Sequence, residues 1–220
     1  MSHSSAKPFR IVLLGPPASG KGTQGRSLAE ALGLGYLSTG ALLREQVENQ
    51  TALGKLAMPI LARGEYLPDD LMCPILAEWL AAQTKGWVLD GFPRSLPQAH
   101  FLANWLMQND QTLTAAVSLE VPQDVLLGRI KERVECANCR WSGQTSQLMS
   151  SNLCPVCQSP AASRADDTAE NFLNRHAEFI ALTQPVIDYY QFASKLHSVA
   201  ATAPQDQVAA EILAYFSHPA

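Results

Sequence analysis

The stretch that most constrains the fold runs from Ile11 to Gln24 and has the sequence IVLLGPPASGKGTQ. It begins with a continuous run of apolar residues, which is typical of a strand buried on both faces of a parallel sheet. A turn rich in glycine and proline follows, with the spacing G-x-x-x-x-G-K from Gly15 to Lys21, and a helical pattern comes next. A strand, such a turn and a helix in this order predict a P-loop, whose backbone N–H groups surround a phosphate while the lysine adds a positive charge.

The alternative interpretation of this stretch is a plain turn between a strand and a helix. Lys21, together with the strand and helix patterns on either side, favours phosphate binding over that alternative. One detail departs from the general P-loop pattern, because Gly22 follows the lysine and the hydroxyl comes one position later, at Thr23. We therefore predict a nucleotide phosphate site in which the placement of Mg²⁺ is less well defined.

The composition of the chain argues against several classes of partner. With 220 residues, the chain is long enough for one substantial domain with insertions. Its net charge is −4 and it has no long run of lysine or arginine, so we expect no binding to nucleic acid or to an anionic membrane. The N-terminal segment MSHSSAKP is polar, and no apolar run approaches the roughly 20 residues that cross a bilayer. We expect a cytoplasmic protein, and a monomer.

Short apolar runs alternate with helical patterns along most of the chain. Strands are predicted at 36–38, 87–89, 115–121 and 196–200, with helices between them. This alternation predicts an α/β fold in which a parallel sheet is covered by helices on both faces. Ligands bind such sheets at the carboxyl ends of the strands. The predicted residues at this edge include Gly15, Thr39, Asp90 and Pro122.

Asp90 directly follows one of these strands, in the segment DGFPR. An Asp-Gly pair on its own is most simply a turn. An acid at the end of a buried strand beside a P-loop is also where a carboxylate associated with Mg²⁺ belongs. Arg94, in the same segment, favours this second interpretation because it would add a phosphate-binding cation beside the acid.

Four of the 5 cysteines lie together in a segment that interrupts the alternation. Cys136-x-x-Cys139 and Cys154-x-x-Cys157 have the spacing that brings four thiolates to one tetrahedral Zn²⁺. The segment has few large apolar side chains, so a structural zinc would hold its shape, with on the order of 10 kcal/mol of apparent folding free energy. Four sulfur ligands leave no coordination position for catalysis. Two disulfides are the alternative, which a reducing compartment disfavours.

Together these motifs resemble the adenylate kinases, within the nucleoside monophosphate kinase family. The resemblance runs from Ile11 to about Tyr190. It rests on GPPASGKGTQ, LSTGALLRE, DGFPR with Gln98, the two cysteine pairs, and RADD with Arg175, in this order. It implies a P-loop core with a helical insertion over the monophosphate and a lid over ATP. We expect the core at 1–38, 68–134 and 165–220, the monophosphate-binding insertion at 39–67, and the zinc-binding lid at 135–164.

The resemblance also implies a reaction and the residues that carry it. The γ-phosphoryl group of MgATP moves to AMP and gives two ADP, so the implied ligands are ATP, AMP, Mg²⁺ with ATP, and structural Zn²⁺ in the lid. The residues implied to bind ATP are Gly15, Pro16, Pro17, Ala18, Ser19, Gly20, Lys21, Gly22, Thr23 and Arg129, the last by stacking on the base. Those implied to bind AMP are Thr39, Gly40, Arg44, Gly91, Arg94, Gln98, Arg164 and Arg175. The implied catalytic set is Lys21, Asp90, Arg94, Arg133, Arg164 and Arg175.

Arg133 has a simpler alternative, a solvated position on the helix face RIKER. Thr39 and Gln98 match positions where adenylate kinases contact adenine, whereas relatives specific for UMP and CMP tend to carry Ala and Asn there. Two departures bear on the ATP side, since Ala18 stands where the family usually has glycine and Ala41 where it usually has an aspartate near Mg²⁺. Two alternatives stay open: a catalytically weakened nucleotide-binding sensor of the same fold, and a kinase for another monophosphate such as UMP or CMP.

Overall fold

The computed structural model describes residues 8–217, so most of the polar N-terminal segment considered above lies outside the described residues. The core strands are β1 (Arg10–Leu14), β2 (Gly35–Ser38), β3 (Trp87–Asp90), β4 (Ala115–Glu120) and β8 (Leu196–Ala200). The core helices are α1 (Lys21–Leu32), α4 (Asp69–Ala81), α5 (Leu96–Gln108), α6 (Gln123–Glu132), α7 (Ala169–Glu178), α8 (Gln184–Phe192) and α9 (Gln205–Ser217).

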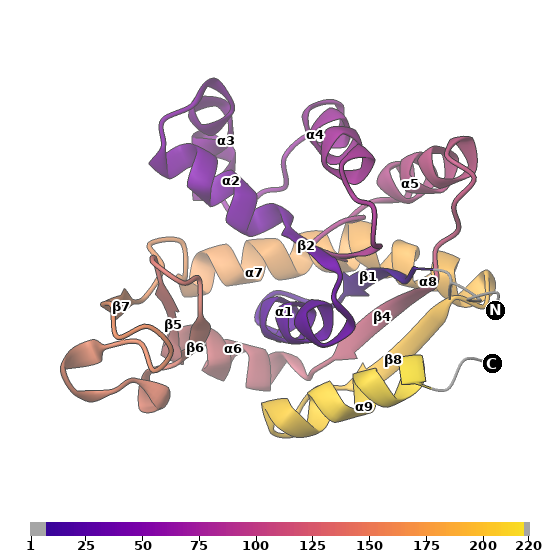
Figure 1. The fold of residues 1–220 in the computed structure, drawn as a ribbon. Helices are drawn as coiled ribbons and strands as arrows, with labels where there is room; N and C mark the ends of the chain where they lie inside the picture. Colours follow the sequence, from indigo (N-terminus) through magenta and orange to yellow (C-terminus); the bar gives the residue numbers. More distant parts are fainter. Residues whose placement is uncertain (1–7, 218–220) are drawn as a thin grey trace.

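A parallel sheet of 5 strands, in the order β2-β3-β1-β4-β8, forms the centre of the molecule (Figure 1). In β1, Ile11 lies opposite Val88 of β3 on one side and Ala115 of β4 on the other. Because β1 is central and every pairing is parallel, the carboxyl ends of the strands share one edge. The predicted sheet is confirmed.

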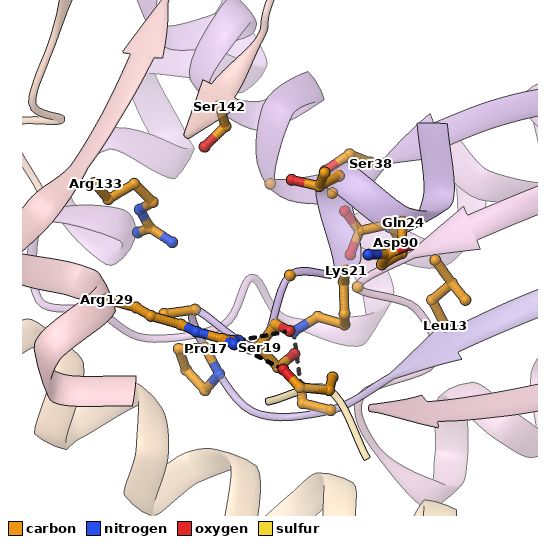
Figure 2. A pocket seen from close by; sticks show the side chains of 18 of the residues that line it. Leu13, Pro17, Ser19, Lys21, Gln24, Ser38, Asp90, Arg129, Arg133 and Ser142 are labelled. Carbon is orange, nitrogen blue, oxygen red and sulfur yellow. Dashed lines mark hydrogen bonds between the residues drawn. The ribbon is translucent and has the colours of Figure 1, made fainter. Parts of the chain in front are cut away.

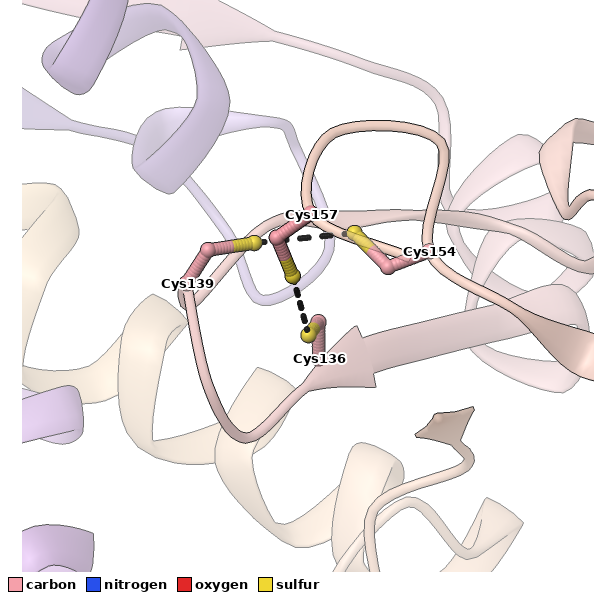
Figure 3. Close-up of side chains that lie close together, drawn as sticks. All are labelled: Cys136, Cys139, Cys154 and Cys157. Carbon is pink, nitrogen blue, oxygen red and sulfur yellow. Dashed lines mark hydrogen bonds between the residues drawn. The ribbon is translucent and has the colours of Figure 1, made fainter. Parts of the chain in front are cut away.

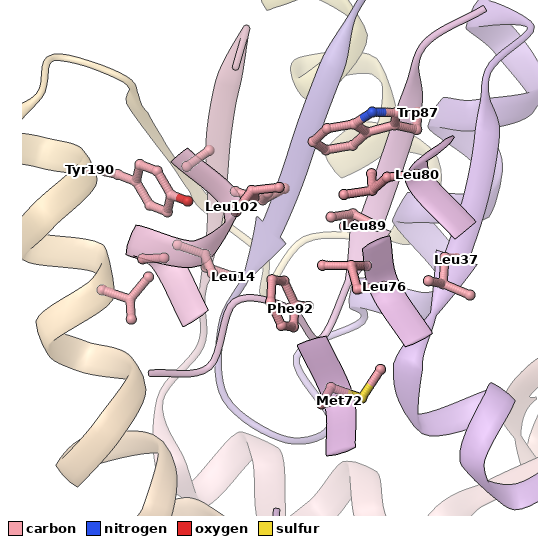
Figure 4. Close-up of a cluster of buried hydrophobic side chains, with 14 of the residues drawn as sticks. Leu14, Leu37, Met72, Leu76, Leu80, Trp87, Leu89, Phe92, Leu102 and Tyr190 are labelled. Carbon is pink, nitrogen blue, oxygen red and sulfur yellow. The ribbon is translucent and has the colours of Figure 1, made fainter. Parts of the chain in front are cut away.

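Side chains of β1 alternate between two hydrophobic cores. Val12 and Leu14 pack in the cluster that includes α4, α5 and α8, part of which Figure 4 shows. Ile11 and Leu13 pack on the other face, with α1 and α9. All four side chains are at most 2% exposed. The uninterrupted apolar run therefore reflects a strand covered by helices on both faces, as predicted.

Two helices between β2 and α4 form a separate projection above the sheet edge (Figure 1). They are α2 (Thr39–Glu48) and α3 (Ala52–Ala62). Side-chain caps begin both helices, because the hydroxyl of Ser38 accepts from the Ala41 N–H and that of Thr51 from the Gly54 N–H. The projection therefore follows the carboxyl end of β2 with no intervening loop.

The cysteine-containing segment forms a small antiparallel sheet at one end of the molecule (Figure 1). Its strands are β5 (Arg133–Cys136), β6 (Ser142–Gln144) and β7 (Ala161–Ala162), in the order β6-β5-β7. Short 3₁₀ turns lie at Thr145–Gln147 and Ser150–Asn152. The sequence pattern did not predict these strands, because each has at most 4 residues, too few for a hydrophobic period to be recognised.

A π-helical segment precedes Pro185 in the long helical stretch near the end of the chain. Residues Phe179–Thr183 form this segment between α7 and α8, and Pro185 lies in the first turn of α8. A wider turn before a proline accommodates the missing N–H and the ring without breaking the helix. Among residues 8–217, no helix is both long and apolar enough to span a membrane.

Candidate active site

One large cleft, with a volume of about 820 Å³, opens at the carboxyl ends of the sheet strands. The loop between β1 and α1 lines it, together with residues from α2, the end of β3, the small sheet and the loop before α9. Figure 2 shows Lys21, Asp90 and Arg133 around the open space. Elements far apart in the sequence therefore meet at the edge where parallel sheets bind ligands.

The loop between β1 and α1 has the backbone conformations of a phosphate-binding turn. Gly15 has a φ of 139° and Gly20 a φ of 101°, both in the region that L side chains rarely adopt. Ala18 also adopts a left-handed φ, of 63°. Gly20 is the N-cap of α1 and has no side chain to bond the first helical amides. A helix N-terminus without a side-chain cap is a favourable place for an anion.

Lys21 begins α1, and its ammonium folds back onto the loop. Nζ donates to the carbonyl oxygens of Gly15, at 2.7 Å, and Pro16, at 2.8 Å. Removal from water lowers the pKa of Lys21 to about 8, and the negative charge of Asp90 opposes this shift. The lysine is thus positioned before any phosphate arrives.

Asp90 is the last residue of β3 and is 7% exposed. Its Oδ2 accepts a hydrogen bond of 3.0 Å from the Tyr36 hydroxyl. Burial and the Asp90 charge both raise the pKa of Tyr36, so the phenol keeps its proton and remains a donor. Sequence reasoning missed Tyr36, because only the pairing of β2 with β3 brings it to the acid.

Arg94 is fixed by contacts with the segments around it. Its Nε donates to the Gly91 carbonyl at 2.6 Å, and its guanidinium lies 4.3 Å from the centre of the Tyr66 ring. Its backbone N–H donates to Oε1 of Gln98 at 2.7 Å, and its Nη2 lies 3.4 Å from Oγ1 of Thr39. Among the described residues, the cleft lining includes Arg94 and Tyr66 but neither Thr39 nor Gln98, which are buried beside Arg94.

Three further arginines of the cleft are paired with carboxylates. The pairs are Arg133 with Asp167, Arg164 with Glu135, and Arg175 with Asp166. Arg133 makes two bonds to its partner and its side chain is 16% exposed, so it is not a solvated position on a helix face. Burial lowers the pKa of Arg164 to about 10, with the charges of Arg133 and Arg44 acting in the same direction, and it stays a cation at neutral pH.

Arg129 joins the phosphate-binding loop to the loop after β8. Its Nη1 donates to the Ser19 carbonyl at 3.3 Å and its Nη2 to the Ala201 carbonyl at 2.7 Å. The planar guanidinium is therefore held between two backbone segments of the cleft.

The four clustered cysteines bring their sulfur atoms together in the small sheet (Figure 3). All four Sγ atoms lie within 4.8 Å of one another, and the Cys136–Cys157 and Cys139–Cys154 separations are both 3.5 Å. A disulfide needs about 2.05 Å, and the cysteines are free thiols. Tetrahedral zinc with Zn–S bonds of about 2.3 Å places its sulfur ligands about 3.8 Å apart, so the arrangement fits one metal ion.

Most of the residues implied by the resemblance come together in the cleft. The lining contains Gly15, Pro17, Ala18, Ser19, Gly20, Lys21, Gly22, Thr23, Gly40, Arg44, Asp90, Gly91, Arg94, Arg129, Arg133, Arg164 and Arg175. Within the described part of the chain, Pro16, Thr39 and Gln98 are not in this lining, although Pro16 accepts the Lys21 hydrogen bond. Sequence reasoning missed Tyr66, which packs on Arg94, and Glu135, which pairs with Arg164. Each makes its contact with an arginine that is distant in the sequence.

Comparison with protein families identifies the fold and the site together. The adenylate kinase family model matches residues 13–195, which include the P-loop, the cysteine pairs and all the paired arginines. The chain belongs to the adenylate kinase family. It is therefore a phosphotransferase that converts ATP and AMP to two ADP, as adenylate kinases do.

Curated relatives support the same assignment over nearly the whole chain. The adenylate kinase of Ruminiclostridium cellulolyticum is 36% identical over 212 residues, covering 93% of this chain and 98% of that protein. The adenylate kinase of Paracoccus denitrificans is 38% identical over 207 residues, covering 93% and 95%. That of Chlamydia pneumoniae is 39% identical over 205 residues, covering 92% and 95%.

Proposed function

We propose that the cleft holds ATP and AMP together, with the P-loop on the ATP phosphates and the arginines around the transferred group and the acceptor phosphate. The observation that supports this assignment is that arginines from elements spread over most of the chain line the same cavity as Lys21. The arginines concerned are Arg44, Arg94, Arg129, Arg133, Arg164 and Arg175.

Phosphoryl transfer between nucleotides requires no covalent intermediate with the protein. Most of the catalysis comes from positioning the two nucleotides and stabilising the charge of the transition state. Guanidinium forks match phosphate oxygens, and Lys21 adds a compact charge beside the P-loop amides. We propose that Lys21 meets the β- and γ-phosphates and that Arg44 and Arg94 hold the AMP phosphate. Arg164 and Arg175 would contact this phosphate as well and would surround the transferred group together with Arg133. Enclosure by the lid would keep water away from that group.

Mg²⁺ accompanies ATP in adenylate kinases, where it offsets negative charge on the phosphates. Asp90 is the residue that we propose holds it, since its carboxylate lies beside Lys21 and at the cleft. Ala41 lines the same cleft but brings only a methyl group. The phenol of Tyr36 would orient the remaining acid through its hydrogen bond.

We propose that AMP is the preferred acceptor and that Thr39 and Gln98 help to select it. Both contact Arg94, which places them next to the proposed monophosphate site. A coupled assay of the purified protein with AMP, UMP and CMP tests this proposal, and we expect the highest kcat/KM with AMP. Equal or faster turnover of UMP or CMP would contradict the preference. Tight binding of a bisubstrate dinucleotide without measurable transfer would instead indicate a nucleotide sensor.

We further propose that zinc occupies the cysteine cluster as a structural ion, because four sulfur ligands suit it and leave no open position. The segments 39–67 and 135–164 are proposed to move as units over the core. The expectation of a cytoplasmic monomer stays a prediction, and light scattering after size-exclusion chromatography tests the monomer.

A further inference from the structure

A buried carboxylate lies among the arginines proposed to hold phosphate. Glu135 is in β5, and its side chain is 9% exposed. One of its oxygens, Oε2, accepts a hydrogen bond from Nε of Arg164 and lies 3.8 Å from Nη2 of Arg44. A single carboxylate oxygen therefore faces two cations, one from the lid's return segment and one from α2.

The side chains of Arg44 and Arg164 are 24% and 19% exposed, so water screens these interactions only partly. In a partly buried site, a carboxylate beside two guanidinium groups offsets part of the positive charge that would otherwise attract a phosphate ligand. A phosphate dianion that binds the same two arginines would also lie close to Glu135, and like charges repel.

We propose that Glu135 weakens binding of the acceptor phosphate by competing with it for Arg44 and Arg164. This inference rests on the proposed placement of the AMP phosphate. Its chemical consequence is that AMP and ADP leave the acceptor site more readily than they would if Arg44 and Arg164 faced no carboxylate. The acceptor site releases ADP in one direction of the reaction and AMP in the other. Weaker binding of the phosphate therefore speeds product release and favours turnover.

The substitution Glu135→Gln distinguishes competition for the arginines from simple positioning of Arg164. Glu135→Gln keeps the shape and an oxygen that accepts from Arg164 Nε, but it removes the negative charge. If competition by charge is the main effect, this variant binds AMP more tightly. If Glu135 serves only to hold Arg164 in place, the variant binds AMP equally well or more weakly.

A second ion pair between the same two elements provides a matched control. Arg140 follows Cys139 and bonds Glu48 of α2, with Nη2 and Oε2 separated by 2.9 Å. Glu48 lies one helical turn from Arg44 and is exposed, with no contact to the phosphate arginines in the described structure other than its electrostatic effect on Arg44. Glu48→Gln therefore weakens contact between the lid and α2 without removing the carboxylate that faces Arg164.

The experiment measures AMP binding by calorimetry and KM by coupled assay for the wild type, Glu135→Gln and Glu48→Gln. We expect Glu135→Gln to lower the Kd and KM for AMP about fivefold, which corresponds to the contribution of about 1 kcal/mol at the upper end for a partly exposed ion pair. Inhibition by adenosine, which lacks the phosphate, should be unchanged in this variant. Glu48→Gln should leave the Kd for AMP within about twofold, as for other exposed pairs.

The outcomes separate this inference from the proposed function. An unchanged or higher Kd for AMP in Glu135→Gln overturns the inference, as does equal tightening in Glu48→Gln, which would point to loosened contact between lid and α2. Equal tightening of adenosine would also overturn it, because the effect would not depend on phosphate. A wild type that binds no AMP contradicts the proposed function itself, whereas normal wild-type binding with no effect of Glu135→Gln contradicts the inference alone.

Discussion

Replacing Ala18 with glycine tests whether the P-loop carries backbone strain. Ala18 has a φ of 63°, a left-handed conformation that costs an L residue about 1 to 2 kcal/mol. Glycine removes this cost, but it also makes the unfolded chain more flexible, which costs roughly 0.4 to 1 kcal/mol. From the middle of each range, about 1.5 and 0.7 kcal/mol, we expect Ala18→Gly to raise the free energy of unfolding by about 0.8 kcal/mol, or the Tm by about 2 to 3 °C for a chain of this length.

Differential scanning calorimetry measures this change, and the chain provides a control of opposite sign. Ala103 is exposed and lies inside α5, so Ala103→Gly should lower the free energy of unfolding by about 1 kcal/mol through lost helix propensity. A Tm that falls in Ala18→Gly by as much as in Ala103→Gly would refute the reasoning. It would mean that the turn holds alanine without strain.

The remaining predictions concern charge and metal. Lys21→Met should lower kcat/KM by about 10² to 10³ while the Tm changes little, because the loop loses a positioned cation but no core packing; near-normal turnover in this variant would remove Lys21 from the mechanism. Burial lowers the pKa of Lys21 to about 8, so its ammonium is present below this pH and is lost above it. The kcat/KM for ATP should therefore fall as pH rises through about 8, whereas a flat profile up to pH 9 would show that this group does not titrate there. Elemental analysis should find about one zinc per chain in the wild type and none in Cys154→Ser, and protease should cut the lid of this variant faster. A metal-free wild type with a protease-resistant lid would contradict a structural role for zinc.

The core of the fold could be predicted from the sequence because its signals are local. The run Ile11 to Leu14 predicts a doubly covered strand from four consecutive residues, and the structure divides these residues between two cores. The cysteine spacing likewise predicts a cluster, and the sulfur atoms lie together. In both cases the interacting groups are adjacent in sequence or tied to a fixed spacing.

The contacts that tune the site depend on distant pairings and were not predictable. Tyr36 reaches Asp90 only through the register of β2 with β3. Tyr66 reaches Arg94, and Glu135 reaches Arg44, from segments whose relative placement no single-sequence pattern specifies. A sequence shows which residues have suitable chemistry, whereas the pairing of acids with arginines requires the three-dimensional arrangement.

The junctions of the small sheet with the core have a mechanical consequence. Helix α6 ends at Glu132 and β5 begins at Arg133, so no spacer separates them, and Arg164 lies just beyond β7 on the return path. Any rotation of the small sheet against α6 must pass through the backbone dihedrals of Arg133 itself. Rotation of this sheet therefore also moves the guanidinium of Arg133, so the position of the sheet and the electric field in the cleft change together.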